Sequence, residues 1–561
     1  MNTSLLLKTT NLFDYFEERQ GDAGTSPWAA RTPRRPSEHF DLMLIPRIQA
    51  WTESAESLEV LASLEREPWV GEVVRREHRV EVRLDDGWIE AVGAALEAGG
   101  AAEAPLRDLA ATQRFSLQFW DANATKALHV GHLRNLAVGN AIAAALRQAG
   151  AQVERRSLIS DAGRSMGEAM AGVVMSGHQT AVWPERNEKS DHFVGVCYAD
   201  YIASEGMFAA ERELEGGEES HIREVQMRDD AADDLVKRVL NGDGEALALW
   251  YKTRAWVIAG QRKTLSRLGV AFDRVFFESD FLQEATDLAA KGLSEGWLRR
   301  REDGVVIYPT GFEDLKELPL VRADGLPTQY LRSLAYCTSA PEVDGMVSLQ
   351  VCGTEWVSHA ASIRKLVDEQ KPTRHGFHPE HSIFHGMVAR QKRAMASSEG
   401  ALLIDDLMDW LDQQIDSDPG RREIRKAHYA PEAIAAQVAL GYFLPYPVVP
   451  RVDFEPSTLL QEGESLGWDL VCARARRGEL QTLSSYSPVG DPDYRFAVVQ
   501  SEIYRRHLRQ ALERFDVVAL GLYLRHLARW YSEDSRNGHV ERVVHTLLDR
   551  SARGLGLDAR Q

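Results

Sequence analysis

The sequence predicts a multidomain α/β protein whose central part contains a parallel β-sheet. Two segments, residues 115–160 and 346–388, each show a strand pattern, an amphipathic helix pattern and a second strand pattern in succession. Such units pair their strands in parallel through a right-handed crossover. A third observation concerns the C-terminal part, where strand patterns stop at Pro431 and long amphipathic helical patterns follow. We therefore expect a parallel-sheet domain followed by an all-helical domain.

Length and composition restrict the class of protein. The chain has 561 residues, of which 44% are hydrophobic, and this is enough for several cores. Its 66 Lys and Arg residues against 84 Asp and Glu residues give a net charge of −18, which excludes a generally basic nucleic-acid coat. No apolar run reaches the roughly 20 residues that cross a bilayer, and the N-terminus does not resemble a signal peptide. We expect a cytoplasmic protein without a membrane segment.

The four cysteines lie far apart and form no CxxC pair. Metal sites and disulfide frameworks usually show closely spaced cysteines. The sequence therefore predicts no structural metal and a reducing compartment.

Three domains are expected along the chain. Residues 1–110 combine a Gly/Pro/Ser-rich loop over 21–37, an alternating strand pattern over 78–86 and a helix closed by glycine, which predicts an N-terminal α+β domain. Residues 111–425 contain the two parallel units, with a mainly helical insertion at about 170–300. Residues 426–561 form the predicted helical domain.

The charge of the C-terminal part differs from that of the rest. Residues 421–561 contain 20 Lys and Arg against 18 Asp and Glu, and Lys426 is the only lysine among those cations. Two interpretations remain open. The arginines belong to an ordinary solvated helix surface, or they form a face that meets a polyanion.

The loop of the first parallel unit carries candidate chemistry. After the strand over 115–120, the loop ends at His129-Val-Gly-His132, where the next helix begins. A helix N-terminus attracts phosphate, and two imidazoles there can donate hydrogen bonds to phosphoryl oxygens. Gly131 permits the close approach of a flat base, and Lys126 adds a positive charge. This set suits a transition state in which charge grows on an α-phosphate. The alternative is a pair of surface histidines, because HxxH alone is a weak motif.

The same residues carry a family resemblance. The segment 123–135, NATKALHVGHLRN, resembles the nucleotide-binding loop of class I aminoacyl-tRNA synthetases, in particular the arginyl-tRNA synthetase pattern S-P-N-x-x-K-x-x-H-V-G-H-L-R. Further segments resemble others of that family and occur in the same order: SDAGR at 160–164, LGVAFD at 268–273 followed by Glu278-Ser279, ADG at 323–325 followed by Tyr330, and GMV at 386–388.

The resemblance implies a Rossmann-type catalytic domain, ATP with Mg²⁺, and activation of arginine as its adenylate before transfer to the 3′ end of tRNA. It implies that His129 and His132, with Lys126, stabilise the α-phosphate, and that Asn123 holds the amino acid near its carboxylate. It further implies an adenosine site formed by Gly131, Gly353, Met387 and Val388. The helical domain, and as a further candidate the N-terminal domain, would contact tRNA. We expect a monomer.

The second class I motif, K-M-S-[KST]-[RK]-x-G, reads AMASSEG at 394–400. Its leading lysine is replaced by Ala394, and Glu399 stands where a cation is common. A lysine at the first position would hold the departing pyrophosphate, so its loss removes a charge-assisted contact. Lys126 and Lys392 are the candidates to supply that charge, and surface charge is the alternative for Lys392.

The amino-acid pocket also departs from the family. The family's guanidinium-binding glutamate corresponds to Gln118, the segment after Tyr330 lacks the family's aspartate, and a family glutamine corresponds to Trp356. The predicted amino-acid contacts are therefore Gln118, Asn123, Tyr330 and Trp356. A buried guanidinium without a carboxylate is poorly compensated. Either another acidic residue has taken over that role, or the substrate differs.

Three functions follow, and arginine–tRNA ligase chemistry is the main prediction. The second is a related enzyme that activates a different amino acid and ligates it to tRNA or to a small amine. The third is a non-catalytic tRNA-binding protein, which the degenerate second motif motivates.

Overall fold

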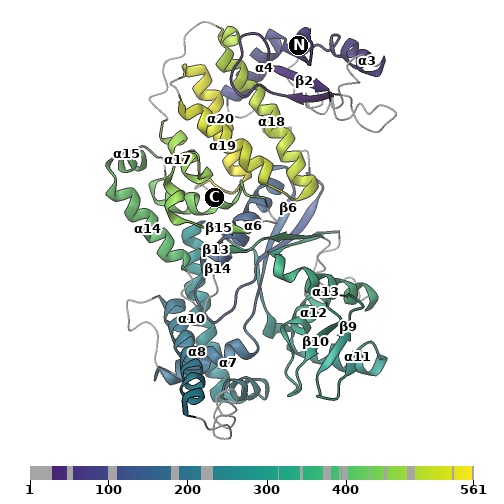
Figure 1. Ribbon diagram of the computed structural model, residues 1–561, viewed down its shortest axis with the longest axis vertical. Helices are drawn as coiled ribbons and strands as arrows, with labels where there is room; N and C mark the ends of the chain where they lie inside the picture. Colours follow the sequence, from purple (N-terminus) through teal and green to yellow (C-terminus); the bar gives the residue numbers. More distant parts are fainter. Residues whose placement is uncertain are drawn as a thin grey trace.

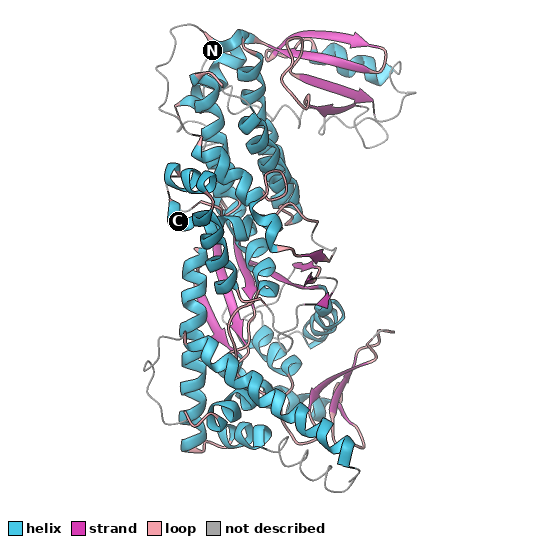
Figure 2. Ribbon diagram, turned by 60° about the vertical axis from the view of Figure 1, so that its left-hand side comes forward, coloured by secondary structure: helices cyan, strands magenta, loops and turns pink. Residues whose placement is uncertain are grey.

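The structure is a computed structural model. It describes residues 28–46, 55–98, 110–178, 189–215, 231–313, 315–340, 345–370, 381–390, 393–394, 402–428, 430–447, 451–476, 487–533 and 536–558. The molecule is elongated, with an N-terminal sheet at one end and a small three-stranded sheet at the other (Figures 1 and 2). A helical bundle and a parallel sheet lie between them.

In the part of it that the structure describes, the N-terminal domain consists of a four-stranded antiparallel sheet and two helices. Its strands β1 (Trp28–Arg31), β2 (Leu42–Pro46), β3 (Val70–Arg76) and β4 (Arg79–Leu84) pair in the order β1-β2-β4-β3. The helices are α3 (Ala55–Leu64) and α4 (Asp86–Glu97). Strand β1 lies inside the stretch 21–37, which the sequence analysis assigned to a loop. That assignment is wrong for residues 28–31, because pairing with β2 stabilises a strand that its own composition does not indicate.

The central sheet is parallel throughout, as predicted. It contains β5 (Arg114–Trp120), β6 (Gln152–Ile159), β7 (Arg274–Phe277), β11 (Val347–Gly353) and β12 (His381–His385), in the order β12-β11-β5-β6-β7. The chain moves outward from β5 to β7 on one side and from β11 to β12 on the other. Strand order therefore reverses between β5 and β11, and the loops diverge there to leave a crevice at the carboxyl ends of the strands.

Helix α6 (Val130–Gln148) connects β5 to β6 and is buried on almost every side. It packs on the sheet and also against helices of the C-terminal bundle, which explains why its sequence is rich in Ala and Leu around the whole circumference. Gly139 permits the close approach to the sheet, because a Cβ there would lie 2.2 Å from the Phe119 ring.

Two lobes extend from the lower edge of the sheet (Figure 1). The first contains α7 (Arg164–Met175), α8 (Ser190–Glu215) and α10 (Gly244–Leu268), between β6 and β7. The second lies between β7 and β11 and contains α11 (Leu282–Glu295), β8 (Arg299–Arg300), β9 (Val306–Pro309), β10 (Glu317–Val321) and α12 (Gln329–Ser339). The mainly helical stretch expected at about 170–300 thus also holds β7, a short strand of the central sheet.

The C-terminal part is helical. After α13 (Val357–Gln370) and the short strands β13 (Val388–Arg390) and β14 (Arg393–Ala394), it comprises α14 (Ile404–Ser417), α15 (Pro419–Ala427), α16 (Ile434–Phe443), α17 (Leu466–Ala475), α18 (Pro492–Arg514), α19 (Val518–Glu533) and α20 (Gly538–Gly554). A two-residue strand, β15 (Val452–Asp453), pairs in parallel with β13, where no strand was expected. Among the described residues, no helix is both long enough and apolar enough to cross a bilayer.

Candidate active site

A cavity of about 440 Å³ opens at the carboxyl ends of β5, β6 and β11, at the point where strand order reverses. It is lined by residues from the strand ends, the start of α6, the second lobe and the loop before β13. Those that the sequence analysis named are His129, Gly131, His132, Gln118, Gly353, Trp356, Met387 and Val388.

His129 and His132 are brought together by the start of α6. His129 is the N-cap residue, and its Nδ1 accepts a hydrogen bond from the Gly131 amide at 3.1 Å. The His129 amide in turn donates to Nδ1 of His132 at 3.1 Å. Because both Nδ1 atoms accept, the proton of each neutral ring resides on Nε2, which leaves two N–H donors for a ligand in the cavity.

Both imidazoles are held neutral. Burial, together with the nearby charge of Lys126, lowers the pKa of His129 to about 4. The pKa of His132 is also lowered well below its usual value, by burial first and then by the positive charge that His129 and Lys126 would place beside it. At neutral pH the rings are therefore hydrogen-bond donors without a charge.

Gly131 lies in the first turn of α6, under the His129 ring. A Cβ at this position would lie 2.8 Å from the ring atoms Cε1 and Nδ1 of His129. Glycine is therefore required for the ring to cap the helix in its observed position.

Lys126 does not line the cavity. Its ammonium lies over the Tyr198 ring of α8, 5.7 Å from the ring centroid. Burial lowers its pKa. Its charge nevertheless lowers the pKa of both histidines, so it acts on the cavity through space.

The side of the cavity formed by Gly353, Met387 and Val388 is fixed by buried polar contacts. The Arg134 guanidinium donates to the carbonyl oxygens of Gly386 at 2.6 Å and Pro447 at 2.8 Å. Asn135 bonds to the Phe119 carbonyl at 2.8 Å and to Nε2 of His385 at 3.1 Å. These contacts connect α6 to the loop between β12 and β13.

Two of the predicted amino-acid contacts do not reach the cavity. The backbone of Asn123 bridges to Ser160, and its carbonyl accepts from Gln261 at 3.1 Å. Tyr330 stacks on His359, with ring centroids 4.6 Å apart, and its hydroxyl bonds to Nε2 of that ring at 2.9 Å. Of the remaining predictions, Lys392 and residues 395–400 of the second motif lie outside the described residues.

The cavity contains polar residues that the sequence analysis did not name as contacts: Asp121, Asn135, Ser160, Glu278, Gln329, Ser333, Gln350, Arg364 and His385. One signal was available for two of them, since Asp121 and Ser160 directly follow the parallel strands β5 and β6. Glu278 is buried and accepts from Arg332 at 2.7 Å and from Ser160 at 2.8 Å, so its charge is already compensated.

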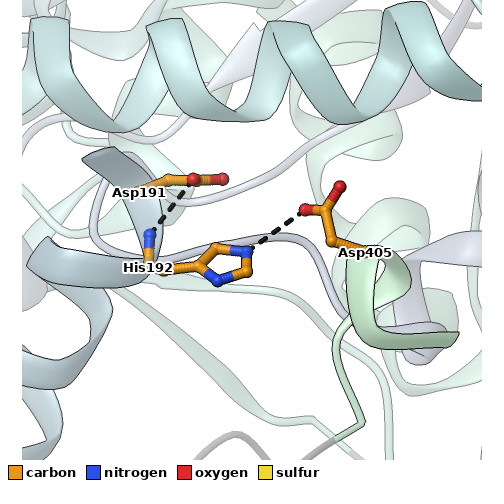
Figure 3. A group of neighbouring side chains, drawn as sticks. All are labelled: Asp191, His192 and Asp405. Atoms are coloured by element: carbon orange, nitrogen blue, oxygen red, sulfur yellow. Dashed lines mark hydrogen bonds and ion pairs between the residues drawn. The ribbon is translucent and has the colours of Figure 1, made fainter. Parts of the chain in front are cut away.

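Outside the cavity, a cluster of two aspartates and a histidine lies between the first lobe and α14 (Figure 3): Asp191, His192 and Asp405. Its oxygen and nitrogen atoms are close enough to hold a metal ion. The ammonium of Lys189, however, lies 2.8 Å from a carboxylate oxygen of each aspartate and 2.6 Å from the hydroxyl of Thr264. The lysine supplies the positive charge, so the group is an internal ion network that joins α8, α10 and α14.

Comparison with known proteins decides the family. The model described as tRNA synthetases class I (R), catalytic domain, matches residues 103–418, which is more than half of the chain. The chain belongs to this family. Its class I (R) catalytic domain contains the parallel sheet, α6 and the cavity.

Curated relatives of this class I (R) member include the arginine–tRNA ligases of Borrelia hermsii and Treponema denticola. The first is 27% identical over 342 residues, which cover 59% of this chain and 54% of the relative. The second is 29% identical over 359 residues, which cover 62% of this chain and 57% of the relative. The matched part thus spans about half the length of these relatives.

Solved structures of class I (R) synthetases share the fold over almost the whole chain. The arginyl-tRNA synthetase of Thermus thermophilus aligns with a TM-score of 0.68 and 19% identity, covering 97% of this chain and 98% of the other. That of Plasmodium falciparum aligns with a TM-score of 0.62 and 14% identity, covering 94% of each. The predicted α/β fold with helical domains is confirmed.

Proposed function

We propose that the protein is an ATP-dependent arginine–tRNA ligase, which activates its amino acid as an adenylate and transfers it to the 3′ end of tRNA. The observation that carries this proposal is the pair of neutral imidazoles at the N-terminus of α6, which line one cavity with Gly353, Met387 and Val388. The curated relatives with the same catalytic domain are arginine–tRNA ligases, and this supports the choice of reaction.

In the proposed first step, the amino-acid carboxylate attacks the α-phosphorus of ATP. A new P–O bond forms, the bond to the β-phosphate oxygen breaks, and pyrophosphate leaves. Negative charge grows on the α-phosphate oxygens, and the Nε2–H groups of His129 and His132 donate hydrogen bonds to them. The dipole of α6 adds partial positive charge at the N-terminus of the helix.

The adenosine lies, in this proposal, against Gly131, Gly353, Met387 and Val388. Magnesium accompanies ATP and neutralises phosphate charge when bound. Lys126 contributes a positive potential from outside the cavity, and Lys392 is assigned to the phosphate side on the sequence resemblance alone. We assign the contact with tRNA to the helical domain, with the N-terminal domain as a second contact, and we place the enzyme in the cytoplasm as a monomer.

A second candidate function is activation of a different amino acid. It is favoured by the lining of the cavity, in which Gln118, Ser333 and Trp356 provide no carboxylate for a guanidinium. The two candidates share the adenylate chemistry and differ only in the amino acid.

Pyrophosphate exchange over a panel of the twenty amino acids, in the presence of tRNA, tests both. Exchange with arginine, lost in His129→Ala, together with arginyl-tRNA formation supports the first proposal. Exchange with another amino acid alone supports the second. Absence of exchange with every amino acid would contradict both and leave a binding protein.

A further inference from the structure

Asp121 is an acidic residue of the cavity whose charge has no cationic partner. It follows β5 directly and lines the cavity, and its accessible surface is open to that space. Its hydrogen-bond partners are neutral donors: the Gln118 side-chain amide at 2.9 Å, the Leu158 backbone amide at 3.4 Å and the Gln350 side chain. Among the described residues, no Lys, Arg or His forms an ion pair with it.

The buried carboxylates of the catalytic domain are compensated. Asp161 pairs with Arg254 at 2.8 Å, and Glu278 pairs with Arg332 at 2.7 Å. The same holds for the buried acids of the two lobes and α14, which pair with lysine or arginine: Glu168, Asp191, Asp233 and Asp405. Asp121 differs from them, because it is exposed to the cavity and pairs with no cation among the described residues, so a cationic ligand that enters the cavity can reach it.

Gln118 provides a second acceptor at the same place. Its side chain is 2% exposed, and its Nε2 is used by the Asp121 carboxylate. Its Oε1 is buried and has no hydrogen-bond partner. Because the amide nitrogen must face the carboxylate, the oxygen is the free atom and needs a donor. A group with several N–H donors and a positive charge would satisfy both side chains.

We infer that Asp121, with the Gln118 amide oxygen, binds a positively charged nitrogen group of the amino-acid substrate. The group is either the guanidinium of a side chain or the α-ammonium. This inference rests on the proposed function in that it takes an amino acid as the ligand of the cavity. The inference explains how a pocket with the neutral residues Gln118 and Ser333 accommodates a cation, since the neighbouring Asp121 supplies the negative charge.

The test compares Asp121→Asn with the unmodified full chain by calorimetric binding. The ligands are L-arginine, L-citrulline, which has a neutral side chain, and 5-guanidinopentanoate, which lacks the α-ammonium. Asp469→Asn is the matched control, because burial raises the pKa of Asp469 to about 6 as well, but this residue lies in α17 of the helical domain. The control is expected to bind arginine normally.

We expect Asp121→Asn to weaken arginine binding on the order of 10²-fold. If the side-chain cation is the ligand, citrulline binds weakly to both proteins. If the α-ammonium is the ligand, Asp121→Asn weakens the binding of citrulline as much as that of arginine. In that case 5-guanidinopentanoate binds weakly to the variant and to the unmodified chain. Equal arginine affinity in Asp121→Asn and the unmodified chain overturns the inference.

If the variant fails to fold, the affinities of the unmodified chain for the three ligands still test the inference. Equal affinities for arginine, citrulline and 5-guanidinopentanoate, or no binding of any of them, would contradict a cation-binding carboxylate. The proposed function is tested separately, by charging of tRNA. If Asp121→Asn charges tRNA with arginine as fast as the unmodified chain, the inference fails and the proposed function stands. If arginine binding depends on Asp121 but no arginyl-tRNA forms, the inference stands and the proposed function fails.

Discussion

At the residue scale, the position of one imidazole depends on the absence of a side chain two residues later. His129 caps α6 by accepting from the Gly131 amide, and its ring occupies the space that a Cβ at Gly131 would enter. The capping ring of His129 is also neutral, so the proposed chemistry depends on the orientation of its N–H donor and not on a charge. Displacement of the ring therefore removes a donor without altering the net charge of the cavity.

We predict that Gly131→Ala lowers the pyrophosphate exchange rate by about 10²–10³-fold, the usual effect of losing one transition-state donor. Far-ultraviolet circular dichroism should show an unchanged fold, since only the His129 ring must shift. Gly490→Ala is the control, because no atom lies within 4 Å of a Cβ at that position. Normal exchange in Gly131→Ala would contradict the role assigned to the ring.

The pKa of Asp121 gives a second prediction at this scale. Burial raises it to about 6, above the ordinary value for aspartate. Binding of a cation requires the ionised form, so affinity for arginine should be full above pH 6 and should decline as pH falls below it. Calorimetry from pH 5 to pH 8 checks this.

The other titratable groups of the cavity provide the controls for that profile. His129 and His385 have pKa values lowered to about 4 by burial, and His132 is lowered as well, so none of them gains a proton in this range. Glu278 is paired with Arg332, but burial raises the pKa of its carboxyl, so it is the group to which a residual decline would be assigned. Asp121→Asn should therefore bind with a flat profile, and persistence of the decline in this variant would assign it to another group.

At the element scale, α6 connects the phosphate side of the cavity to the adenosine side. Its N-terminus carries the histidines, and one turn later Arg134 holds the carbonyl of Gly386, next to Met387. The same guanidinium holds Pro447 of the helical part. Movement of the loop before β13 is thereby coupled to the helix that positions the imidazoles.

We predict that Arg134→Met lowers kcat/KM for ATP by about 10- to 100-fold, because the loop loses its anchor and the base site shifts. Two buried carbonyls lose a charged donor, so the free energy of unfolding should fall by about 2–5 kcal/mol. Exchange kinetics and urea unfolding measure the two effects. Arg299→Met, at an exposed ion pair on β8, is the control and should change neither.

The same scale shows where elements are predictable from the sequence. The strand over 115–120 and the helix ending before Gly150 agree with β5 and α6, because each carries a full period of its pattern and a terminal signal. Strands β1 and β7 were missed. Each has four residues, and such segments become strands only by pairing with neighbours that come from elsewhere in the chain.

At the scale of the whole molecule, the N-terminal domain is attached to the helical bundle by a buried ion network. Arg495 of α18 donates to both carboxylate oxygens of Asp41, at 3.0 and 2.6 Å, and to Asp86 at 2.6 Å. It also donates to the Leu84 carbonyl at 2.7 Å. Because the domain is expected to contact tRNA, this junction sets its position relative to the bundle.

We predict that Arg495→Met destabilises the protein by about 3–5 kcal/mol, because the buried Asp41 is left without its cation. Urea unfolding measures the change, and limited proteolysis should release the N-terminal domain earlier. Arg35→Ala, which breaks an exposed pair with Glu533 at the same end of the molecule, should cost less than about 1 kcal/mol. A small effect of both variants would show that other contacts hold the junction.

The sequence by itself determined the parallel sheet, the helical C-terminal part and the identity of several cavity residues. His129, Gly131, His132, Gly353, Met387 and Val388 belong to short ordered motifs, and such motifs specify local backbone that leads each residue to the same sheet edge. Local information was sufficient there, because helix caps and strand ends are set by residues nearby in the chain.

Only the tertiary structure decided which side chains complete the cavity. Lys126, Asn123 and Tyr330 belong to motif segments, yet their side chains or backbones are engaged with α8, Gln261 and His359 instead. Burial among segments that are distant in the sequence raises the pKa of Asp121, against the lowering effect of hydrogen bonds from Gln118, Leu158 and Gln350. The physical reason is that burial and charge compensation depend on distant segments meeting in space, and sequence spacing does not encode them.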